Sequence, residues 1–175
     1  YYIYSIQFKK IMKSIQAIPK KIFSLTDLLK QVKSWRLLNK KIVFTNGVFD
    51  MLHQGHIASL CEAAQQGHIL IVGINSDASV KKLKGPNRPV QNQNDRAMLL
   101  ASLVMTDAII VFDEDTPLQL ITAILPDVLV KGGDYSIDQI AGAKEVLANG
   151  GKVHIAKIVE GFSTTETIKK ISGSM

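Results

Sequence analysis

The sequence has one cysteine in 175 residues and no long uninterrupted apolar run. Cys61 has no second cysteine in the chain with which to form a disulfide, and no CxxC or Cys/His cluster offers ligands for a structural zinc ion. No apolar stretch approaches the roughly 20 residues of a membrane span. The opening stretch, residues 1–18, is interrupted by lysines and lacks a signal-peptide core. We therefore expect a cytoplasmic protein with no membrane partner.

Acidic residues are scarce at the beginning of the chain, and this explains its high isoelectric point. Residues 1–41 hold ten Lys and Arg but one acid, Asp27, whereas residues 42–175 hold eleven against fourteen. The net charge of +6 thus comes from the N-terminal segment, and the main body lacks the continuous basic face that nucleic-acid binding requires. We expect no nucleic-acid partner. The chain divides into a basic extension, residues 1–22, and one globular domain, residues 23–175.

Short apolar segments rich in β-branched residues alternate along the chain with longer segments of helical period. The run Ile69-Leu70-Ile71-Val72 has no polar alternation, which indicates a strand covered on both faces. The predicted strands are residues 41–45, 69–74, 108–112, 127–130 and 153–158. The predicted helices are residues 24–38, 55–66, 94–104, 117–124, 137–149 and 164–171. This alternation predicts an α/β fold: a single domain with a Rossmann-like, doubly wound, parallel five-stranded sheet.

Functional residues are expected just after the strands, because ligands of such sheets bind beyond the carboxyl ends of the strands. The first predicted strand runs into Thr45-Asn46-Gly47-Val48-Phe49-Asp50-Met51-Leu52-His53-Gln54-Gly55-His56. His53 and His56 are three residues apart at the start of a helix, so they share one face, and the positive end of that helix favours phosphate. Gly47 lets the backbone approach a ligand closely, and Gly55 keeps the turn between the histidines narrow.

Three interpretations of the histidine pair are open from the residues alone. A metal site would need a third ligand, for which Asp50 is the nearby candidate. The histidines can also be ordinary structural residues. The interpretation that we favour is phosphate stabilisation, because imidazoles at a helix N-terminus can donate hydrogen bonds to charge that develops on a transferring phosphoryl group.

Polar and basic residues also follow the second predicted strand. Asn75-Ser76-Asp77 leads into Lys81, Lys82 and Lys84, which precede Gly85-Pro86-Asn87-Arg88-Pro89. We interpret this stretch as a cationic loop without regular structure that can fold over phosphates, with a solvated charge run as the alternative. Arg96, early in the next helix, is expected to point toward the ligand.

Two further segments have the composition of ligand-binding loops. Lys131-Gly132-Gly133-Asp134-Tyr135 follows the fourth strand, with Lys131 expected near phosphate and Asp134 on a hydroxyl group or a ring nitrogen. Ser163-Thr164-Thr165-Glu166 opens the last predicted helix, where hydroxyls and free amides can bind phosphate. Ser163 and Glu166 also have the spacing of a helix capping box, and the two roles are compatible.

The segment TNGVFDMLHQGH resembles the HxGH signature of the nucleotidyltransferase superfamily. The similarity continues through GINSDASVKKLKGPNRPV, ILPDVLVKGGDY and GFSTTETIKKI, which together resemble the adenylyltransferase domain of the bacterial ADP-heptose synthase family. This resemblance implies transfer of AMP from ATP to D-glycero-β-D-manno-heptose 1-phosphate, releasing pyrophosphate, in lipopolysaccharide precursor synthesis. It implies Mg²⁺ bound with ATP and no metal ligands from side chains. It also implies a heptose kinase, which we expect as a separate chain.

The resemblance also assigns roles to individual residues. The residues implied in catalysis are His53, His56 and Lys84. The residues implied in nucleotide binding are Thr45, Asn46, Gly47, Phe49, Gly55, His56, Arg96, Lys131, Gly133, Asp134, Ser163, Thr164 and Thr165. Asp50, Asn75 and Asp77 are expected to bind the sugar phosphate. The alternatives are a cytidylyltransferase acting on glycerol 3-phosphate or a similar alcohol phosphate, and a non-catalytic nucleotide-binding module; a homo-oligomer is possible in each case.

Overall fold

The computed structural model describes residues 15–133, 135–157 and 173. In these residues, five parallel strands form one sheet in the order β3-β2-β1-β4-β5. The strands are β1 (Ile42–Gly47), β2 (Ile69–Asn75), β3 (Ala108–Phe112), β4 (Val128–Gly132) and β5 (Lys152–Ala156). The direction of winding reverses between β1 and β4, as in a Rossmann-like sheet. The predicted fold class is therefore confirmed.

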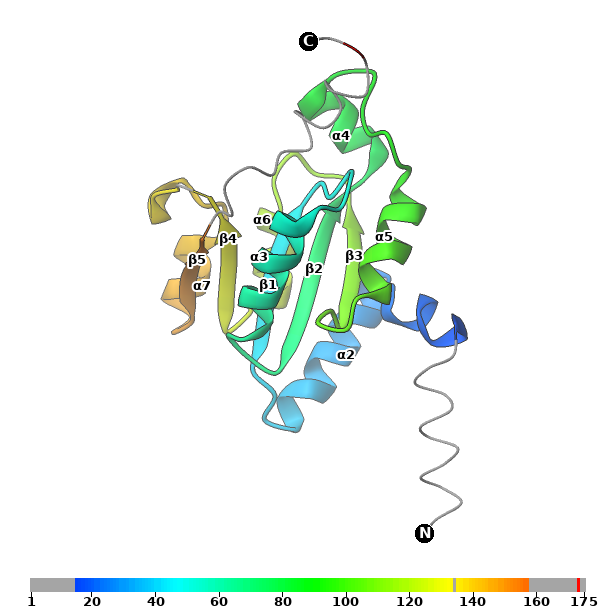
Figure 1. The fold of residues 1–175 in the computed structure, drawn as a ribbon. Helices are drawn as coiled ribbons and strands as arrows, with labels where there is room; N and C mark the ends of the chain where they lie inside the picture. The colour runs from blue at the N-terminus through cyan, green and yellow to red at the C-terminus, as the bar shows by residue number, and fades with distance from the viewer. Residues whose placement is uncertain (1–14, 134, 158–172, 174–175) are drawn as a thin grey trace.

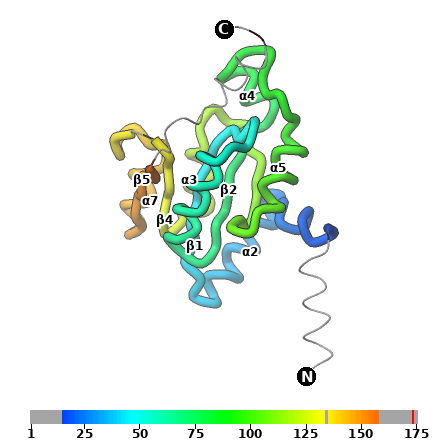
Figure 2. Tube along the Cα trace, in the orientation of Figure 1, coloured from blue at the N-terminus to red at the C-terminus, as the bar shows by residue number. Residues whose placement is uncertain are grey.

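Helices cover both faces of the sheet (Figures 1 and 2). One face packs against α3 (Gln54–Ala64) and α5 (Gln93–Ser102), and the other packs against α2 (Leu25–Leu37), α6 (Leu118–Ile124) and α7 (Ala143–Ala148). In β1, Phe44 belongs to the core under α2, α6 and α7, whereas its neighbour Val43 belongs to the core under α3 and α5. Both faces of the strands are buried, which explains why the strands read as continuous apolar runs.

The lysine-rich segment after β2 corrects a prediction. Lys81, Lys82 and Lys84 lie in a helix, α4 (Asp77–Lys84), and not in an irregular loop. The helix begins at Ser76, whose side-chain oxygen accepts a hydrogen bond from Ser79 N at 3.1 Å. The lysines occupy its last turn, where the C-terminal end of the helix dipole favours cations. The irregular loop begins at Gly85, which adopts φ +94°.

The predicted helix over residues 137–149 is divided in two. A short 3₁₀ helix, η3 (Ile137–Gln139), is followed by a turn at Gly142 and then by α7. Gly142 has φ +84°, and a Cβ atom at this position would lie 2.6 Å from a side-chain carbon of Ile121. Glycine is therefore required here both by the backbone conformation and by the close approach to α6. The predicted helix over residues 164–171 lies outside the described residues.

The segment before α2 is joined to the sheet. It contains the 3₁₀ helices η1 (Ile15–Ala17) and η2 (Pro19–Lys21), and Ile22 forms a single parallel bridge with Ile109 of β3. Lys21 Nζ donates hydrogen bonds to the carbonyl oxygens of Leu103 (3.2 Å) and Thr106 (2.8 Å). Lys21 and Ile22 therefore contact the domain, and the division of the chain at residue 22 stays a prediction. No helix in the described part of the chain is long and apolar enough to cross a membrane.

Candidate active site

The turn between β1 and α3 brings the two predicted histidines together at the carboxyl edge of the sheet. His53 is the N-cap of α3, and its Nδ1 accepts a hydrogen bond from His56 N at 3.4 Å. The two imidazole rings are stacked, with centroids 3.8 Å apart and an interplanar angle of 21°. The Phe49 ring packs against His56 at a centroid distance of 5.2 Å. The expected placement of both histidines at a helix start agrees with the structure, and their catalytic role stays a prediction.

Burial favours the neutral form of both histidines. Burial lowers the pKa of His56 to about 4; the neighbouring His53 and Lys84 lower this pKa further, while the Met51 carbonyl acts in the opposite direction. Burial also lowers the pKa of His53. A neutral imidazole keeps one N–H group, so a ring whose N–H points into the pocket can donate one hydrogen bond to a phosphate oxygen without carrying a charge of its own.

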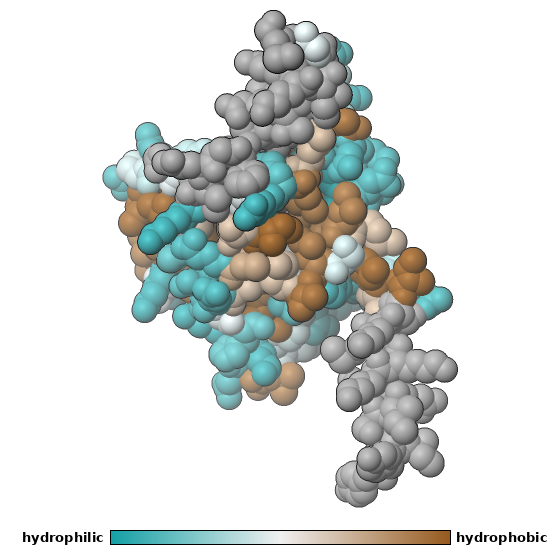
Figure 3. Space-filling model, in the orientation of Figure 1, coloured by the Kyte–Doolittle hydropathy of each residue, from teal (hydrophilic) through white to brown (hydrophobic). Residues whose placement is uncertain are grey.

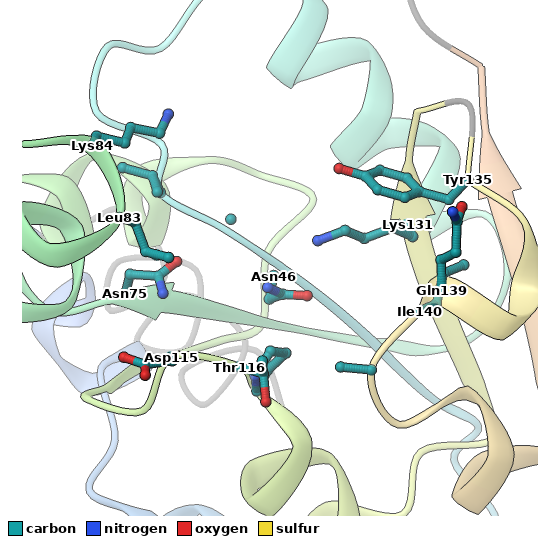
Figure 4. A pocket seen from close by; sticks show the side chains of 14 residues that line it. Asn46, Asn75, Leu83, Lys84, Asp115, Thr116, Lys131, Tyr135, Gln139 and Ile140 are labelled. Atoms are coloured by element: carbon teal, nitrogen blue, oxygen red, sulfur yellow. The ribbon is translucent and has the colours of Figure 1, made fainter.

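Two adjoining pockets lie at this edge, with volumes of about 490 Å³ and about 200 Å³. The larger is shown in Figure 4 and reaches the ends of β1, β2 and β4. The smaller lies between α3 and the end of β4 and contains His56. The residues that line both pockets are Asn46, Gly47, Val48, Lys131 and Tyr135. Because their walls are shared, ligands in the two pockets would meet at the end of β1.

Two lysines line the larger pocket from opposite sides (Figure 4). Burial lowers the pKa of both Lys84 and Lys131; for Lys84, Arg88 lowers it further and Asp50 raises it. The Lys131 ammonium group lies 5.8 Å from the centroid of the Tyr135 ring. Neither lysine forms an ion pair with a residue that the structure describes. Partly desolvated cations without an acidic partner favour an anionic ligand in this pocket.

Arg96 lines neither of the two pockets, and its role as a nucleotide ligand stays a prediction. Its side chain is 0% exposed, and its three nitrogens donate to protein groups. Nε donates to Gln91 O at 3.0 Å, Nη1 to Val48 O at 2.7 Å and Nη2 to Asp77 Oδ1 at 2.8 Å. Arg96 therefore ties the turn after β1 to α4 and α5. Asp77, predicted to bind the sugar phosphate, is occupied by this ion pair and lines neither pocket.

Asp50 is also an anchor within the protein, and its predicted role in binding the sugar phosphate stays a prediction. Its side chain is 1% exposed. Oδ2 accepts a hydrogen bond from Arg88 Nε at 2.6 Å, and Oδ1 accepts from the backbone nitrogens of Val90 (2.7 Å) and Gln91 (3.0 Å). These three bonds hold the loop between α4 and α5 against the β1–α3 turn. No three His, Cys, Asp or Glu side chains in the described residues gather as metal ligands, which argues against a metal site built on Asp50 and the histidines.

The other predicted site residues fall into three sets: those that line a pocket, those that lie elsewhere in the described structure, and those outside the described residues. Those that line one or both pockets are Thr45, Asn46, Gly47, Phe49, Asn75 and Lys131. Gly55 lies in the first turn of α3. Gly133 has φ +125°, and a Cβ atom there would lie 2.8 Å from the Tyr135 ring. The residues outside the described part of the chain are Asp134, Ser163, Thr164 and Thr165.

Gly47 also meets a packing requirement within the protein, while its expected close approach to a ligand stays a prediction. A Cβ atom at this position would lie 2.9 Å from the Phe49 ring, because Phe49 adopts φ +49° and turns its side chain back over β1. Glycine at this position thus makes room for the aromatic ring that packs on His56. Phe49 is one of the few non-glycine residues of the described chain with positive φ, a strained conformation that is common at functional sites.

Sequence reasoning missed several residues of this region. Arg88 was seen as part of a cationic loop, but nothing in the sequence pairs it with Asp50. Its side chain is 13% exposed, and its buried Nη2 has no hydrogen-bond partner among the residues that the structure describes. The larger pocket is also lined by Asp115, Thr116 and Gln139. These residues lie in loops and in η3 and form no recognisable motif, so only the fold reveals them.

The chain belongs to the cytidylyltransferase-like family, which matches residues 44–175. The doubly wound sheet and the paired histidines after β1 indicate the same class of protein, the nucleotidyltransferases. The bifunctional protein HldE of Paramagnetospirillum magneticum is 51% identical over 154 residues, which cover 88% of this chain and 32% of that protein. HldE of Vibrio cholerae is 50% identical over 152 residues, covering 87% and 32%. The chain thus spans about a third of the length of these curated relatives.

Two solved structures have the same fold. The lipopolysaccharide core biosynthesis protein from Thermoplasma volcanium GSS1 is 28% identical, with a TM-score of 0.55, and the match covers 69% of this chain and 97% of that one. Pantoate-beta-alanine ligase from Francisella tularensis, solved with β,γ-ATP and β-alanine, is 16% identical, with a TM-score of 0.53 and coverage of 80% and 70%. The second similarity supports the fold alone.

Proposed function

We propose that the chain transfers AMP from ATP to D-glycero-β-D-manno-heptose 1-phosphate, giving ADP-heptose and pyrophosphate. The observation that carries this proposal is the identity of about half of the residues with HldE over almost nine tenths of the chain. The HldE relatives are bifunctional and the match covers about a third of their length, so the proposal concerns one of their activities. The stacked histidines at the start of α3 supply a physical reason for nucleotidyl transfer.

In the proposed reaction, an oxygen of the sugar phosphate attacks the α-phosphorus of ATP in line. The bond between the α-phosphorus and the bridging oxygen breaks, and pyrophosphate leaves. No covalent intermediate with the protein is needed, so the protein contributes positioning and charge stabilisation. His53 and His56 would donate their N–H groups to the oxygens of the α-phosphate. Lys84 and Lys131 would hold phosphates from the two sides of the larger pocket, and Ser163, Thr164 and Thr165 would bind the β- and γ-phosphates.

We propose that Mg²⁺ enters the site bound to ATP. In the described residues, no cluster of three acidic, His or Cys side chains offers a protein-only site. Magnesium is usually held through substrate phosphates and water with few protein ligands. When bound, it neutralises part of the charge of the triphosphate. The chain's own lysines and imidazoles then act on the α-phosphate and on the acceptor.

The test compares nucleotides and acceptors in one experiment. The protein is incubated with Mg²⁺ and ATP or CTP, together with D-glycero-β-D-manno-heptose 1-phosphate or glycerol 3-phosphate, and pyrophosphate and products are quantified by mass spectrometry. We expect ADP-heptose from ATP and the heptose phosphate. Preference for CTP and glycerol 3-phosphate would indicate the cytidylyltransferase alternative. Nucleotide binding without pyrophosphate release from any pair would indicate a non-catalytic module.

A homo-oligomer and a separate heptose kinase stay predictions, as does the cytoplasmic location. The apolar residues on the face covered by α3 and α5 support the first of these (Figure 3). Met98 and Leu99 of α5 are 38% and 41% exposed, and contiguous exposed apolar side chains are typical of interaction surfaces. Light scattering of the purified chain tests for an oligomer, and a double substitution of Met98 and Leu99 by glutamine would then dissociate it.

A further inference from the structure

The larger pocket has an acidic side that the proposed triphosphate chemistry does not use. We propose that Asp115 and Thr116, in the loop between β3 and α6, bind hydroxyl groups of the acceptor sugar. This inference rests on the proposed function and adds to it the residues that recognise the sugar. Both residues line the pocket of about 490 Å³, a volume within the usual range for small-molecule sites.

Charge is separated across this pocket. In Figure 4, Lys84 and Lys131 lie on opposite sides, and Asp115 and Thr116 lie near one another along another part of the wall. A carboxylate repels phosphate and accepts hydrogen bonds from hydroxyl groups, and a threonine hydroxyl can both donate and accept. A sugar 1-phosphate has the complementary distribution, since its phosphate is anionic and its remaining hydroxyls are neutral donors. The phosphate would thus lie between the lysines with the sugar ring toward Asp115.

The loop that carries these residues is positioned by the beginning of α4. Ser76 N donates a hydrogen bond to Phe112 O at 2.8 Å, and Ser79 Oγ donates to Glu114 O at 3.3 Å. Ser79 Oγ also accepts a hydrogen bond from Asn75 Nδ2 at 3.0 Å. The side chain of Asp115 has no ion pair and no hydrogen bond with the described residues. Its backbone is therefore held while its carboxylate is available to a ligand.

The ribose of ATP also carries hydroxyl groups, but the smaller pocket suits the nucleoside better. That pocket contains His56, which is proposed to act on the α-phosphate, and its walls also include the polar residues Thr45 and Ser59. Neither Asp115 nor Thr116 lines it. In an in-line displacement, the acceptor approaches the α-phosphorus from the side opposite to pyrophosphate. The shared wall at the end of β1 is where the acceptor phosphate and the α-phosphate would meet, with the sugar in the larger pocket.

The test uses two aspartates of the same loop. Asp115→Ala removes the proposed ligand, and Asp113→Ala removes another exposed carboxylate that does not line the pocket. Both variants are assayed for kcat and for the KM of ATP and of D-glycero-β-D-manno-heptose 1-phosphate. A hydrogen bond to a charged group is worth enough to change affinity by about tenfold or more. We expect Asp115→Ala to raise the KM of the sugar phosphate by about this factor and to leave the KM of ATP within about twofold, with neither KM changed in Asp113→Ala.

Calorimetric titration with the heptose phosphate measures the same loss of affinity without turnover. An unchanged affinity for the sugar phosphate in Asp115→Ala overturns the inference, and so does a rise confined to the KM of ATP, which would assign Asp115 to the ribose. Equal effects in both aspartate variants would reduce Asp115 to a general electrostatic contribution and also overturn it. Binding of the sugar phosphate through Asp115 without formation of ADP-heptose would contradict the proposed function and leave this inference standing.

Discussion

Charged groups at the carboxyl edge of the sheet are of two kinds. Asp50 and Arg96 are almost completely buried, and each makes three hydrogen bonds with other parts of the protein. Lys84 and Lys131 lie at the same edge with no ion pair to a described residue, and burial lowers the pKa of each. His56 shares one property with the two lysines, because burial lowers its pKa as well.

The two groups have different roles: the first holds the loops around the site in position, and the second is available to act on a bound phosphate. A buried charge is costly unless hydrogen bonds compensate it, so the compensated pairs hold the loops around the site in fixed positions. The uncompensated groups are kept partly desolvated by the same loops, and a bound phosphate would compensate them. Substitutions in the first group should therefore reduce folding stability first, and substitutions in the second should reduce turnover first.

The largest effect is expected for Arg96→Met. Loss of the guanidinium leaves Val48 O, Gln91 O and the Asp77 carboxylate without their donor, and breaking a buried pair in this way costs about 3–5 kcal/mol. Urea denaturation followed by circular dichroism measures the free energy of unfolding. Lys33→Met, on the exposed surface of α2, is the matched control and should change it by less than about 0.5 kcal/mol. A similar, small loss in both variants would contradict an anchoring role for Arg96.

The histidines should show the opposite behaviour. His56→Ala and His53→Ala are each expected to lower kcat by about 10²- to 10³-fold, the usual cost of removing a donor to a developing charge, while the fold is kept. Pyrophosphate release measures turnover, and thermal melting checks the fold. His68→Ala serves as control, because His68 lies before β2 at the other end of the sheet and accepts a hydrogen bond from Lys41 N. Unchanged turnover in both active-site variants would remove the histidines from the mechanism.

Lys21, like Asp50 and Arg96, is a charged residue held by hydrogen bonds to other parts of the protein. It nevertheless precedes the domain that the sequence indicates. A chain that begins at Phe23 loses both hydrogen bonds of Lys21 and the packing of Ile18 and Ile22 on the core, a loss of about 2 kcal/mol or more. A chain that begins at Ile15 keeps all of these contacts, so its stability and kcat should equal those of the full chain. Thermal melting of the two truncated proteins decides the matter; equal melting temperatures would restore residues 1–22 as a dispensable extension.

The smallest expected effect is a dependence of stability on pH. The pKa of His56 is about 4 in the folded protein, below its ordinary value of 6.5, so the unfolded chain binds more protons between these values. The contribution of His56 is complete above pH 6.5 and is lost as pH falls toward about 4. Urea unfolding at pH 7 and pH 5 should show a larger loss for the unmodified protein than for His56→Gln. The reverse order would mean that the ring is not desolvated in the folded state.

Much of the fold could be predicted because its signals are local. Strand β3 agrees with the prediction at both ends, and the other strands differ by one or two residues. The helix over Lys81 to Lys84 was missed because the glycine and prolines that follow it were taken to act on the preceding residues as well. The division of residues 137–149 was missed because Gly142 is required by contact with Ile121, a residue of another helix.

The site shows the same division between local and long-range information. Residue order alone determined that His53 and His56 share one face at the start of α3, because three residues on a helix span almost one turn. It also determined that this turn follows a buried strand. Only the tertiary structure decided that Asp50 holds Arg88, that Arg96 is buried against Val48, and that Asp115 reaches the larger pocket. Such contacts join residues far apart in the chain. The role of a charged side chain depends on its hydrogen-bond partners and its exposure to solvent, and both are set by the folded structure.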